Sequence, residues 1–454
     1  MTQKILNLLL FLLSFSAAAS AQLVGFEEEI PQNFKCSKPQ ELALSSDYYK
    51  EGAKSLEWNF TPGSVIDVAV EKPFALKDDN GIMLWIYNER PQKDSLRFEF
   101  YAPGGDVSYR FAFRLYSAGW RACWIGFKNM QGDKKNHNVA GYRIIAPERK
   151  GRVYLDRLTF PVKKINDRTT PDLQMPSNNS LSYRDLWHWC RVWQWEQYKY
   201  DIPLAKQLTA DEKQDLATVE KRLTEALDVR VAPKKQVEKA YATFKKVNIR
   251  KSGDGFTGAP IVAPDELNRK KGEITLNDVE DMLAGFALDA YCNHSAEASK
   301  NYFLVWDYAI NQGFAFGSGM GTNHHYGYQI SRVYNTAWLM RDAIWRSKNR
   351  DNILSTLIFW SALQETRVPA KAGRDELLDS WHTLLMAKTV SSLLMVNPCE
   401  RVRALTGLTR WLSGTLQYTP GTIGGIKVDG TTFHHGGFYP AYTTGVLAMI
   451  GQYI

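Results

Sequence analysis

Residues 95–115 read SLRFEFYAPGGDVSYRFAFRL, and their pattern repeats every two residues. Large apolar side chains take alternate positions on both sides of a Pro- and Gly-rich segment, namely Leu96, Phe98, Phe100, Tyr109, Phe111, Phe113 and Leu115. A period of two is typical of strands with one buried face, and Pro and Gly favour turns. This stretch therefore predicts two strands joined by a turn.

The same period extends outward through the N-terminal part of the chain. Further strand candidates lie at 65–70, 82–87 and 153–160, with turn-forming residues between them. Many short strands at this spacing indicate an antiparallel sandwich. We expect residues 22–162 to form a β-sandwich of the jelly-roll kind, similar to a carbohydrate-binding domain.

A helical period begins after a linker region at 163–207 whose first part is polar and rich in Pro and Asn. Thr209 and Glu212 have the spacing of a capping box, and an apolar stripe follows at Leu216, Val219, Leu223 and Leu227. Further helices are expected at 276–291, 298–311, 328–346, 351–365, 375–395 and 400–414. Short loops between helices favour a partial (α/α) toroid over 208–454, so the fold class is multidomain β + α.

The first 21 residues have the features of a secretory signal. Lys4 precedes an apolar run at 5–15 that is too short to span a bilayer, and Ala19-Ser20-Ala21 fits the cleavage rule. We expect cleavage after Ala21 and a secreted or periplasmic, monomeric protein without a membrane span. The five cysteines form no metal pattern; buried free thiols are favoured, and one disulfide stays open.

Composition narrows the classes of function. Hydrophobic residues make 44% and charged residues 23%, which excludes a mainly disordered chain. The net charge of +8 spread over 454 residues is weak for nucleic-acid binding but suits an acidic substrate. The sequence has no P-loop, dinucleotide fingerprint or nucleophile elbow, so no organic cofactor is expected.

Acidic residues in the sandwich suggest one metal site. Glu27 opens the first strand candidate, and Asp156 lies on the last. Together with backbone carbonyls near 47–55 they would suit a hard cation such as calcium. Solvated surface acids are the alternative.

A tryptophan-rich helix is expected in the linker region, containing Trp187, His188, Trp189, Trp193, Trp195 and Tyr198. Indole rings can stack on sugars. Packing of this helix between the two domains is the favoured interpretation.

Half of the eight histidines fall in two pairs. Asn323, His324 and His325 follow glycines, and the second pair stands in Asp429-Gly-Thr-Thr-Phe-His434-His435-Gly-Gly-Phe-Tyr439-Pro440-Ala-Tyr442. Both are expected to be turns that enter helices, with Pro440 in a first helical turn. A catalytic site and a zinc site are both open, although neither pair has the spacing of a helical zinc motif.

These residue types suit β-elimination of a uronic acid. Asn or His can stabilise the charge that develops on the sugar carboxylate, while Tyr and His can exchange the protons at C5 and O4. Glycoside hydrolysis normally needs a pair of carboxylates, which is not evident here.

The segment 429–442 resembles the catalytic segment of polysaccharide lyase family eight, and the overall arrangement is similar to its chondroitin sulfate ABC lyase branch. Tyr49-Lys-Glu-Gly-Ala-Lys-Ser-Leu56, Tyr154-Leu-Asp-Arg-Leu-Thr-Phe160 and Thr322-Asn-His-His-Tyr-Gly-Tyr328 carry the resemblance too. It implies cleavage of chondroitin and dermatan sulfates, so a sulfated glycosaminoglycan is the expected partner.

The resemblance also implies roles for single residues. His435 matches the histidine beside the uronate carboxylate, Tyr442 the general acid, and His325 the base for iduronate. His434 stands where some relatives have Arg, and Asn323 is a weaker match to a carboxylate-neutralising asparagine. Substrate-binding roles are expected for these two and for His324, Tyr439 and Arg332.

One departure concerns the family's catalytic Arg and Glu, which would lie beyond Ile454. We therefore expect a truncated product of a longer enzyme, whose own activity is open. The alternative function is a secreted glycan-binding protein, or an inactive lyase fragment, that holds sulfated polysaccharide without cleaving it.

Overall fold

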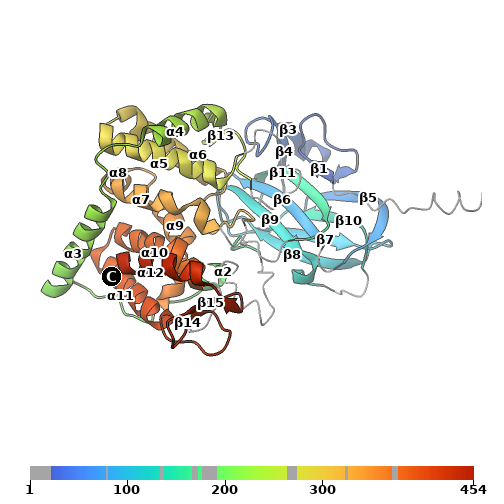
Figure 1. Ribbon diagram of the computed structural model, residues 1–454. Helices are drawn as coiled ribbons and strands as arrows, with labels where there is room; N and C mark the ends of the chain where they lie inside the picture. Colours follow the sequence, from blue (N-terminus) through green and yellow to red (C-terminus); the bar gives the residue numbers. More distant parts are fainter. Residues whose placement is uncertain are drawn as a thin grey trace, which may run out of the picture.

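The computed structural model describes residues 22–77, 80–132, 137–165, 172–175, 192–262, 274–322, 326–370 and 377–453. The expected signal peptide lies outside these ranges. Figure 1 shows most of the strands gathered at one side of the molecule and the helices at the other. The expected order of a β domain followed by an α domain is confirmed.

The sandwich consists of two antiparallel sheets. One has the order β3-β4-β11-β6-β9, with β1 paired to β11, and the other has the order β2-β5-β10-β7-β8. The strands are β1 Gln22–Val24, β2 Phe34–Cys36, β3 Leu42–Ser45, β4 Ser55–Phe60, β5 Val65–Ala75, β6 Gly81–Asn88, β7 Ser95–Tyr101, β8 Val107–Arg114, β9 Gly119–Gly126, β10 Asn138–Ile145 and β11 Gly151–Val162. Single 3-10 turns lie at Pro39–Glu41 and Phe127–Asn129.

The predicted alternation places aromatic rings between the two sheets. Phe98 on β7 is paired in register with Phe111 on β8, and their rings stack at 4.5 Å. Leu96, Phe98 and Phe100 are all fully buried. Burial of such rings is the main source of stability in a sandwich core.

Strands β6 and β9 are buried along their whole length, which a period of two does not predict. Their second face carries Trp85, Tyr87, Trp120 and Trp124, which belong to the same apolar core as the helices. The sheet therefore has one face in the sandwich core and the other against the helical domain.

A buried lysine joins the two domains. Nζ of Lys50 donates to the backbone carbonyl of Gln312 at 2.7 Å and to its Oε1 at 3.0 Å. The same ammonium lies 3.8 Å from the ring centre of Trp85. A cation out of water needs such partners, so this contact specifies how the loop after β3 meets the helical domain.

The short helix α2 Val192–Trp195 precedes the helical domain. Ten of the helices described here form that domain, namely α3 Ala210–Leu227, α4 Lys234–Val247, α5 Leu276–Asn293, α6 Ala296–Asn311, α7 Ser331–Leu339, α8 Arg341–Arg346, α9 Arg350–Trp360, α10 Leu377–Leu394, α11 Pro398–Thr415 and α12 Pro440–Tyr453. Small strands lie at β12 Arg250–Ser252, β13 Gly255–Thr257, β14 Gly425–Ile426, β15 Thr432–His434 and β16 Gly437–Phe438, and 3-10 turns at Tyr326–Gln329 and Leu363–Arg367.

Several expected helices are confirmed and two are shorter than expected. The capping box of Thr209 and Glu212 is formed at the start of α3. The expected helix 328–346 is wrong as one element, because a 3-10 turn precedes α7 and Met340 separates α7 from α8. The expected helix 351–365 stops at Trp360, because Ala362 takes the left-handed conformation with φ 55°.

The predicted tryptophan helix ends earlier than expected. The described part, α2, ends at Trp195, and Tyr198 lies beyond it. Trp187, His188 and Trp189 lie outside the described residues. Trp195 is buried in the core shared by the two domains, which confirms packing for this residue.

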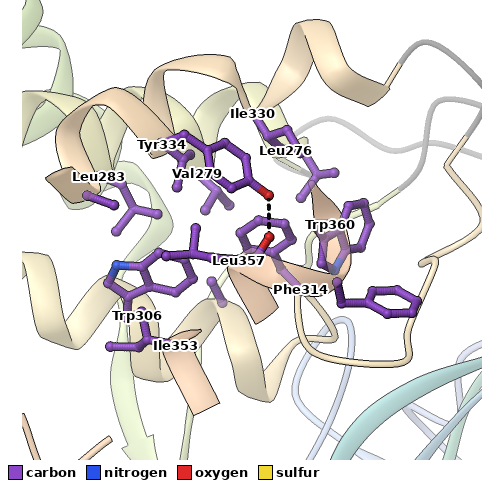
Figure 2. Close-up of a cluster of buried hydrophobic side chains, with 14 of the residues drawn as sticks. Leu276, Val279, Leu283, Trp306, Phe314, Ile330, Tyr334, Ile353, Leu357 and Trp360 are labelled. Atoms are coloured by element: carbon purple, nitrogen blue, oxygen red, sulfur yellow. Dashed lines mark hydrogen bonds between the residues drawn. The ribbon is translucent and has the colours of Figure 1, made fainter. Parts of the chain in front are cut away.

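Aromatic and aliphatic side chains fill the centre of the helical domain (Figure 2). Tyr334 of α7 donates to the backbone carbonyl of Leu357 on α9 at 2.9 Å, so its hydroxyl is satisfied inside this apolar cluster. The labelled members are Leu276, Val279, Leu283, Trp306, Phe314, Ile330, Tyr334, Ile353, Leu357 and Trp360.

Candidate functional site

The second histidine pair lies on a tight hairpin. His434 at the end of β15 is paired with Gly437 at the start of β16, so two residues form the turn. Both have positive φ, 52° for His435 and 75° for Gly436. Such a turn matches the twist of the strands it joins but is unusual for a residue with a side chain. Non-glycine residues held this way are frequent at functional sites.

The two histidines of the hairpin differ in their burial. The ring of His434 is buried and that of His435 is exposed at the turn. The ring centres are 3.7 Å apart with an angle of 32° between the planes. Tyr439 packs edge-on against both rings, at 5.5 Å from His434 and 6.2 Å from His435.

Helix α12 starts directly after the hairpin, at Pro440 as the sequence predicts. The backbone N–H of Tyr439 donates to the carbonyl of Thr432 on β15 at 3.1 Å. The hydroxyls of Thr432 and Thr443 also form a hydrogen bond. These contacts hold the backbone of Tyr442, in the first turn of α12, close to the hairpin.

Asp379 of α10 lies beneath the hairpin. Its Oδ2 is 3.5 Å from Nε2 of His434. Its Oδ1 accepts a hydrogen bond from the hydroxyl of Tyr328 at 3.4 Å, and that hydroxyl is 3.2 Å from Nδ1 of His382. Asp379 thus links two groups of imidazole and phenol side chains.

A buried ion pair supports this part of α10. Nζ of Lys388 is 2.9 Å from Oε1 of Glu365, with both side chains no more than 2% exposed. Ser380, the neighbour of Asp379, donates to Glu365 at 3.4 Å and accepts from Lys388 at 3.3 Å. The pair therefore restrains the turn of α10 that carries Asp379.

Comparisons with known proteins bear on this arrangement. Residues 20–177 match the family model "Lyase, N terminal", and residues 202–454 match "Lyase, catalytic". The chain belongs to polysaccharide lyase family eight. The catalytic match covers the hairpin, Asp379 and α12.

Two curated relatives show how much of a related protein this chain covers. A chondroitin sulfate ABC exolyase of Bacteroides thetaiotaomicron is 29% identical over 96% of this chain and 46% of its own length. A chondroitin sulfate ABC exolyase of Proteus vulgaris is 25% identical over 94% of this chain and 46% of its own length. The chain thus spans about half the length of the curated relatives it matches.

The first histidine pair of this lyase family member, with Asn323, His324 and His325, lies outside the described residues. The segment before it rests on the sandwich, because a side chain at Gly321 would lie 1.8 Å from the ring of Trp124 on β9. After it, burial raises the pKa of the Tyr326 hydroxyl, with a smaller contribution from nearby Glu365. Tyr326 is therefore neutral at ordinary pH.

Arg332 of α7 has carboxylate partners on α5. Its guanidinium donates to Glu280 at 2.6 and 3.1 Å and to Asp281 at 2.7 Å. Lys239 of α4 pairs with the same Asp281 at 2.6 Å. These contacts tie α4, α5 and α7 together, and the substrate-binding role of Arg332 stays a prediction.

The structure brings Glu27 and Asp156 to the same loop. Oε2 of Glu27 accepts from the backbone N–H of Ala53 at 2.9 Å. Asp156 accepts from the N–H groups of Lys50, Glu51 and Arg157 at 2.8, 3.0 and 2.7 Å. Burial, with a smaller contribution from the charge of Glu27, raises the pKa of Asp156 to about 8, although the three backbone N–H groups lower it. A cation bound beside the two carboxyl groups would favour their ionised forms.

Other findings concern metal binding, thiols and membranes. Within the described ranges, no group of three or more His, Cys, Asp and Glu side chains is arranged to hold a metal ion. Cys36, Cys123, Cys292 and Cys399 are free thiols, and Cys190 lies outside the described residues. Among the helices described, none has the length and apolar character needed to cross a membrane.

Sequence reasoning missed Asp379 and His382. One signal could have found them, because they lie three residues apart in the expected helix 375–395 and so share a helical face. Their placement beside His434 and Tyr328 depends on how α10 packs, which periodicity does not predict.

Proposed function

We propose that this chain is the sandwich and helical part of a lyase that cleaves chondroitin and dermatan sulfates by β-elimination at the uronic acid. The observation that carries the proposal is the hairpin of β15 and β16, which presents His435 at an exposed turn beside the start of α12. The match of residues 202–454 to the catalytic lyase model supports it. Relatives named as chondroitin sulfate ABC lyases support the choice of substrate.

The proposed reaction begins at the uronate carboxylate. His435 and Asn323 bind it and stabilise the negative charge that develops when the C5 proton leaves. Tyr442 removes this proton from glucuronate, and His325 removes it from iduronate, whose proton is on the opposite face. The C4–O4 bond breaks as the C4=C5 double bond forms, and Tyr442 protonates O4. No oxidant or reductant is required.

His434 has a supporting role in this proposal. Its buried ring stacks beneath His435 and faces Asp379, so it can hold the outer imidazole in place. Contact of His434 with the polysaccharide, as expected from sequence, stays a prediction.

The test is formation of the unsaturated uronate, followed by its ultraviolet absorbance with chondroitin sulfate as substrate. We expect Tyr442→Phe and His435→Ala to lose product formation while the fold is kept. Tyr418→Phe is the matched control, because Tyr418 is exposed in the loop before β14. Product formed equally by Tyr442→Phe would contradict the proposed acid.

A glycan-binding protein without catalysis is the second candidate. The exposed His435 and Tyr439 on the hairpin favour contact with a ligand at this place. Chondroitin sulfate binding that His435→Ala weakens, with no unsaturated product from the unchanged protein, would favour this alternative over the lyase.

We also propose a calcium ion at Glu27 and Asp156, completed by backbone carbonyls of the 47–55 loop. When bound, the ion would neutralise two carboxylates and hold this loop against β11. Calcium binding would be measured as the difference in thermal unfolding temperature between the protein with calcium and the protein with a chelator. We further propose that the protein acts as a secreted or periplasmic monomer.

A further inference from the structure

Pockets line the length of α3, which Figure 1 shows at the edge of the helical domain away from the sandwich. One of about 480 Å³ lies where α3 begins beside α11, and one of about 520 Å³ lies between α3, α8 and α11. Both are lined by Ala217, Glu220 and Arg401, so they form one continuous groove, here called the α3 groove. A third pocket of about 660 Å³ lies across α8, near the end of α3.

Basic residues predominate along this surface. The α3 groove is lined by Lys206, Lys213, Lys221, Arg341 and Arg401, against the acids Glu220 and Glu225. The third pocket adds Arg230 and Arg346 against Asp342. Within the α3 groove, Glu220 pairs with Arg401 at 2.7 Å and Glu225 with Lys221 at 3.8 Å, so the excess positive charge of the lining is carried by Lys206, Lys213 and Arg341. A cleft lined by an excess of one sign of charge raises the local concentration of ligands of the other sign.

Two guanidinium groups in the groove lie over indole rings. Arg401 of α11 lies 4.7 Å from the ring centre of Trp345, and Arg341 of α8 lies 4.7 Å from that of Trp338. Arg401 is only 14% exposed at its side chain and pairs with Glu220 at 2.7 Å. Stacked guanidiniums lose little conformational freedom when they bind an anion.

The indole rings are themselves anchored. Nε1 of Trp345 donates to the carbonyl of Leu394 at 2.9 Å, and Nε1 of Trp338 donates to Oγ1 of Thr224 at 3.1 Å. The two Arg–Trp stacks are therefore a rigid part of the groove. The exposed Lys206 and Lys213 extend the basic lining toward the start of α3, where Asp211 and Glu212 also stand.

The shape of this surface selects an extended anion. Helix α3 has 18 residues and is about 27 Å long, so one small anion would meet only a fraction of the basic side chains. We propose that the α3 groove binds a segment of sulfated polysaccharide, apart from the hairpin of β15 and β16 and without acting on it. The sulfated class rests on the proposed function, whereas binding of a polyanion rests on the groove alone.

The test measures binding of chondroitin sulfate polymer by isothermal titration calorimetry at low and at physiological salt. The groove variant replaces three exposed basic residues of the α3 groove and one of the adjoining third pocket by glutamine: Lys206→Gln, Lys213→Gln, Lys221→Gln and Arg346→Gln. We expect its affinity to fall on the order of tenfold, because each lost contact of this exposed kind contributes modestly. None of these four side chains is buried, so the fold should be kept.

A matched control removes the same charge from the open sheet of the sandwich. It combines Lys35→Gln, Arg97→Gln, Arg110→Gln and Arg114→Gln, which are also exposed. We expect this control to bind within about twofold of the unchanged protein if the effect is local rather than one of net charge. Equal losses in the two variants, or unchanged affinity in the groove variant, would overturn the proposal.

Two further measurements separate this proposal from the lyase proposal. In a protein that already carries His435→Ala, the four groove substitutions should still lower polymer affinity on the order of tenfold, so failure of the elimination reaction leaves the binding result intact. Double-stranded DNA of similar length should bind more weakly than chondroitin sulfate. If DNA binds as tightly as chondroitin sulfate, and the groove variant loses this DNA binding, the groove is a nucleic-acid site. That result would overturn the proposal of a sulfated polysaccharide.

Discussion

Nε2 of His434 lies 3.5 Å from Oδ2 of Asp379, and neither side chain is more than 1% exposed. This carboxylate comes from the middle of the helical domain, whereas the histidine comes from the hairpin. Because His434 stacks directly on His435, the contact connects the exposed imidazole to the buried helix α10.

Asp379→Asn should disturb the histidine stack without unfolding the protein. The amide keeps the size of the side chain but removes the carboxyl group that faces His434. We expect product formation to fall by about tenfold or more, since small misplacements of reacting groups are costly. The imidazole signals of His434 and His435 in NMR should shift as well. Asp342→Asn, on the surface of α8, is the control; equal behaviour of the two variants would exclude a special role for Asp379.

The conformation of His435 predicts which residues can replace it. Asn tolerates positive φ, so His435→Asn should leave the hairpin stable while it removes the imidazole. A β-branched residue does not, and His435→Val should cost about 1–2 kcal/mol in the free energy of unfolding. Urea unfolding of both variants measures the difference. If Val and Asn are equally stable, the backbone at this turn is not restricted as the φ of 52° indicates.

The buried pair of Glu365 and Lys388 should be sensitive to loss of one partner. Lys388→Met leaves a carboxylate out of water and should destabilise the protein by about 3–5 kcal/mol. Replacing both residues, with Glu365→Leu and Lys388→Met, should cost less than the lysine change alone. A double-mutant cycle in urea tests this, and additive losses would show that the two charges do not depend on one another.

The raised pKa of Asp156 predicts how stability changes with pH. The folded protein keeps a proton on this carboxyl up to about pH 8, whereas the unfolded chain loses it near its ordinary value. The folded state therefore binds more protons between these values, and the free energy of unfolding should fall as pH rises through this window in a chelator. This contribution opposes folding at neutral pH.

Calcium should remove that dependence if the proposed ion binds. It stabilises the ionised carboxylates, so thermal unfolding near pH 8 should move upward with calcium and change little near pH 5. Glu27→Gln is the comparison variant, because it removes one charge and should lose most of the calcium effect. A calcium effect that is the same in this variant would place the ion elsewhere.

Local patterns in the sequence were enough for much of the secondary structure. Alternating apolar residues predicted β7 and β8, because a strand presents every second side chain to one core. Thr209 with Glu212, and the first-turn proline at 440, marked helix starts through contacts or backbone angles within a few residues. The turn at the second histidine pair is predicted in the same way, since its motif lies within one short segment, whereas the pairing of β15 with β16 is not predicted.

Contacts between distant segments required the folded chain. The burial of both faces of β6 and β9, the contact of Asp379 with His434, and the contact of Arg401 with Trp345 join residues far apart in sequence. Periodicity specifies which side of an element is apolar, but not which other element it meets. That choice is made when the sheet and the helices compete to bury their apolar faces together, and it also decides which polar groups lie next to one another.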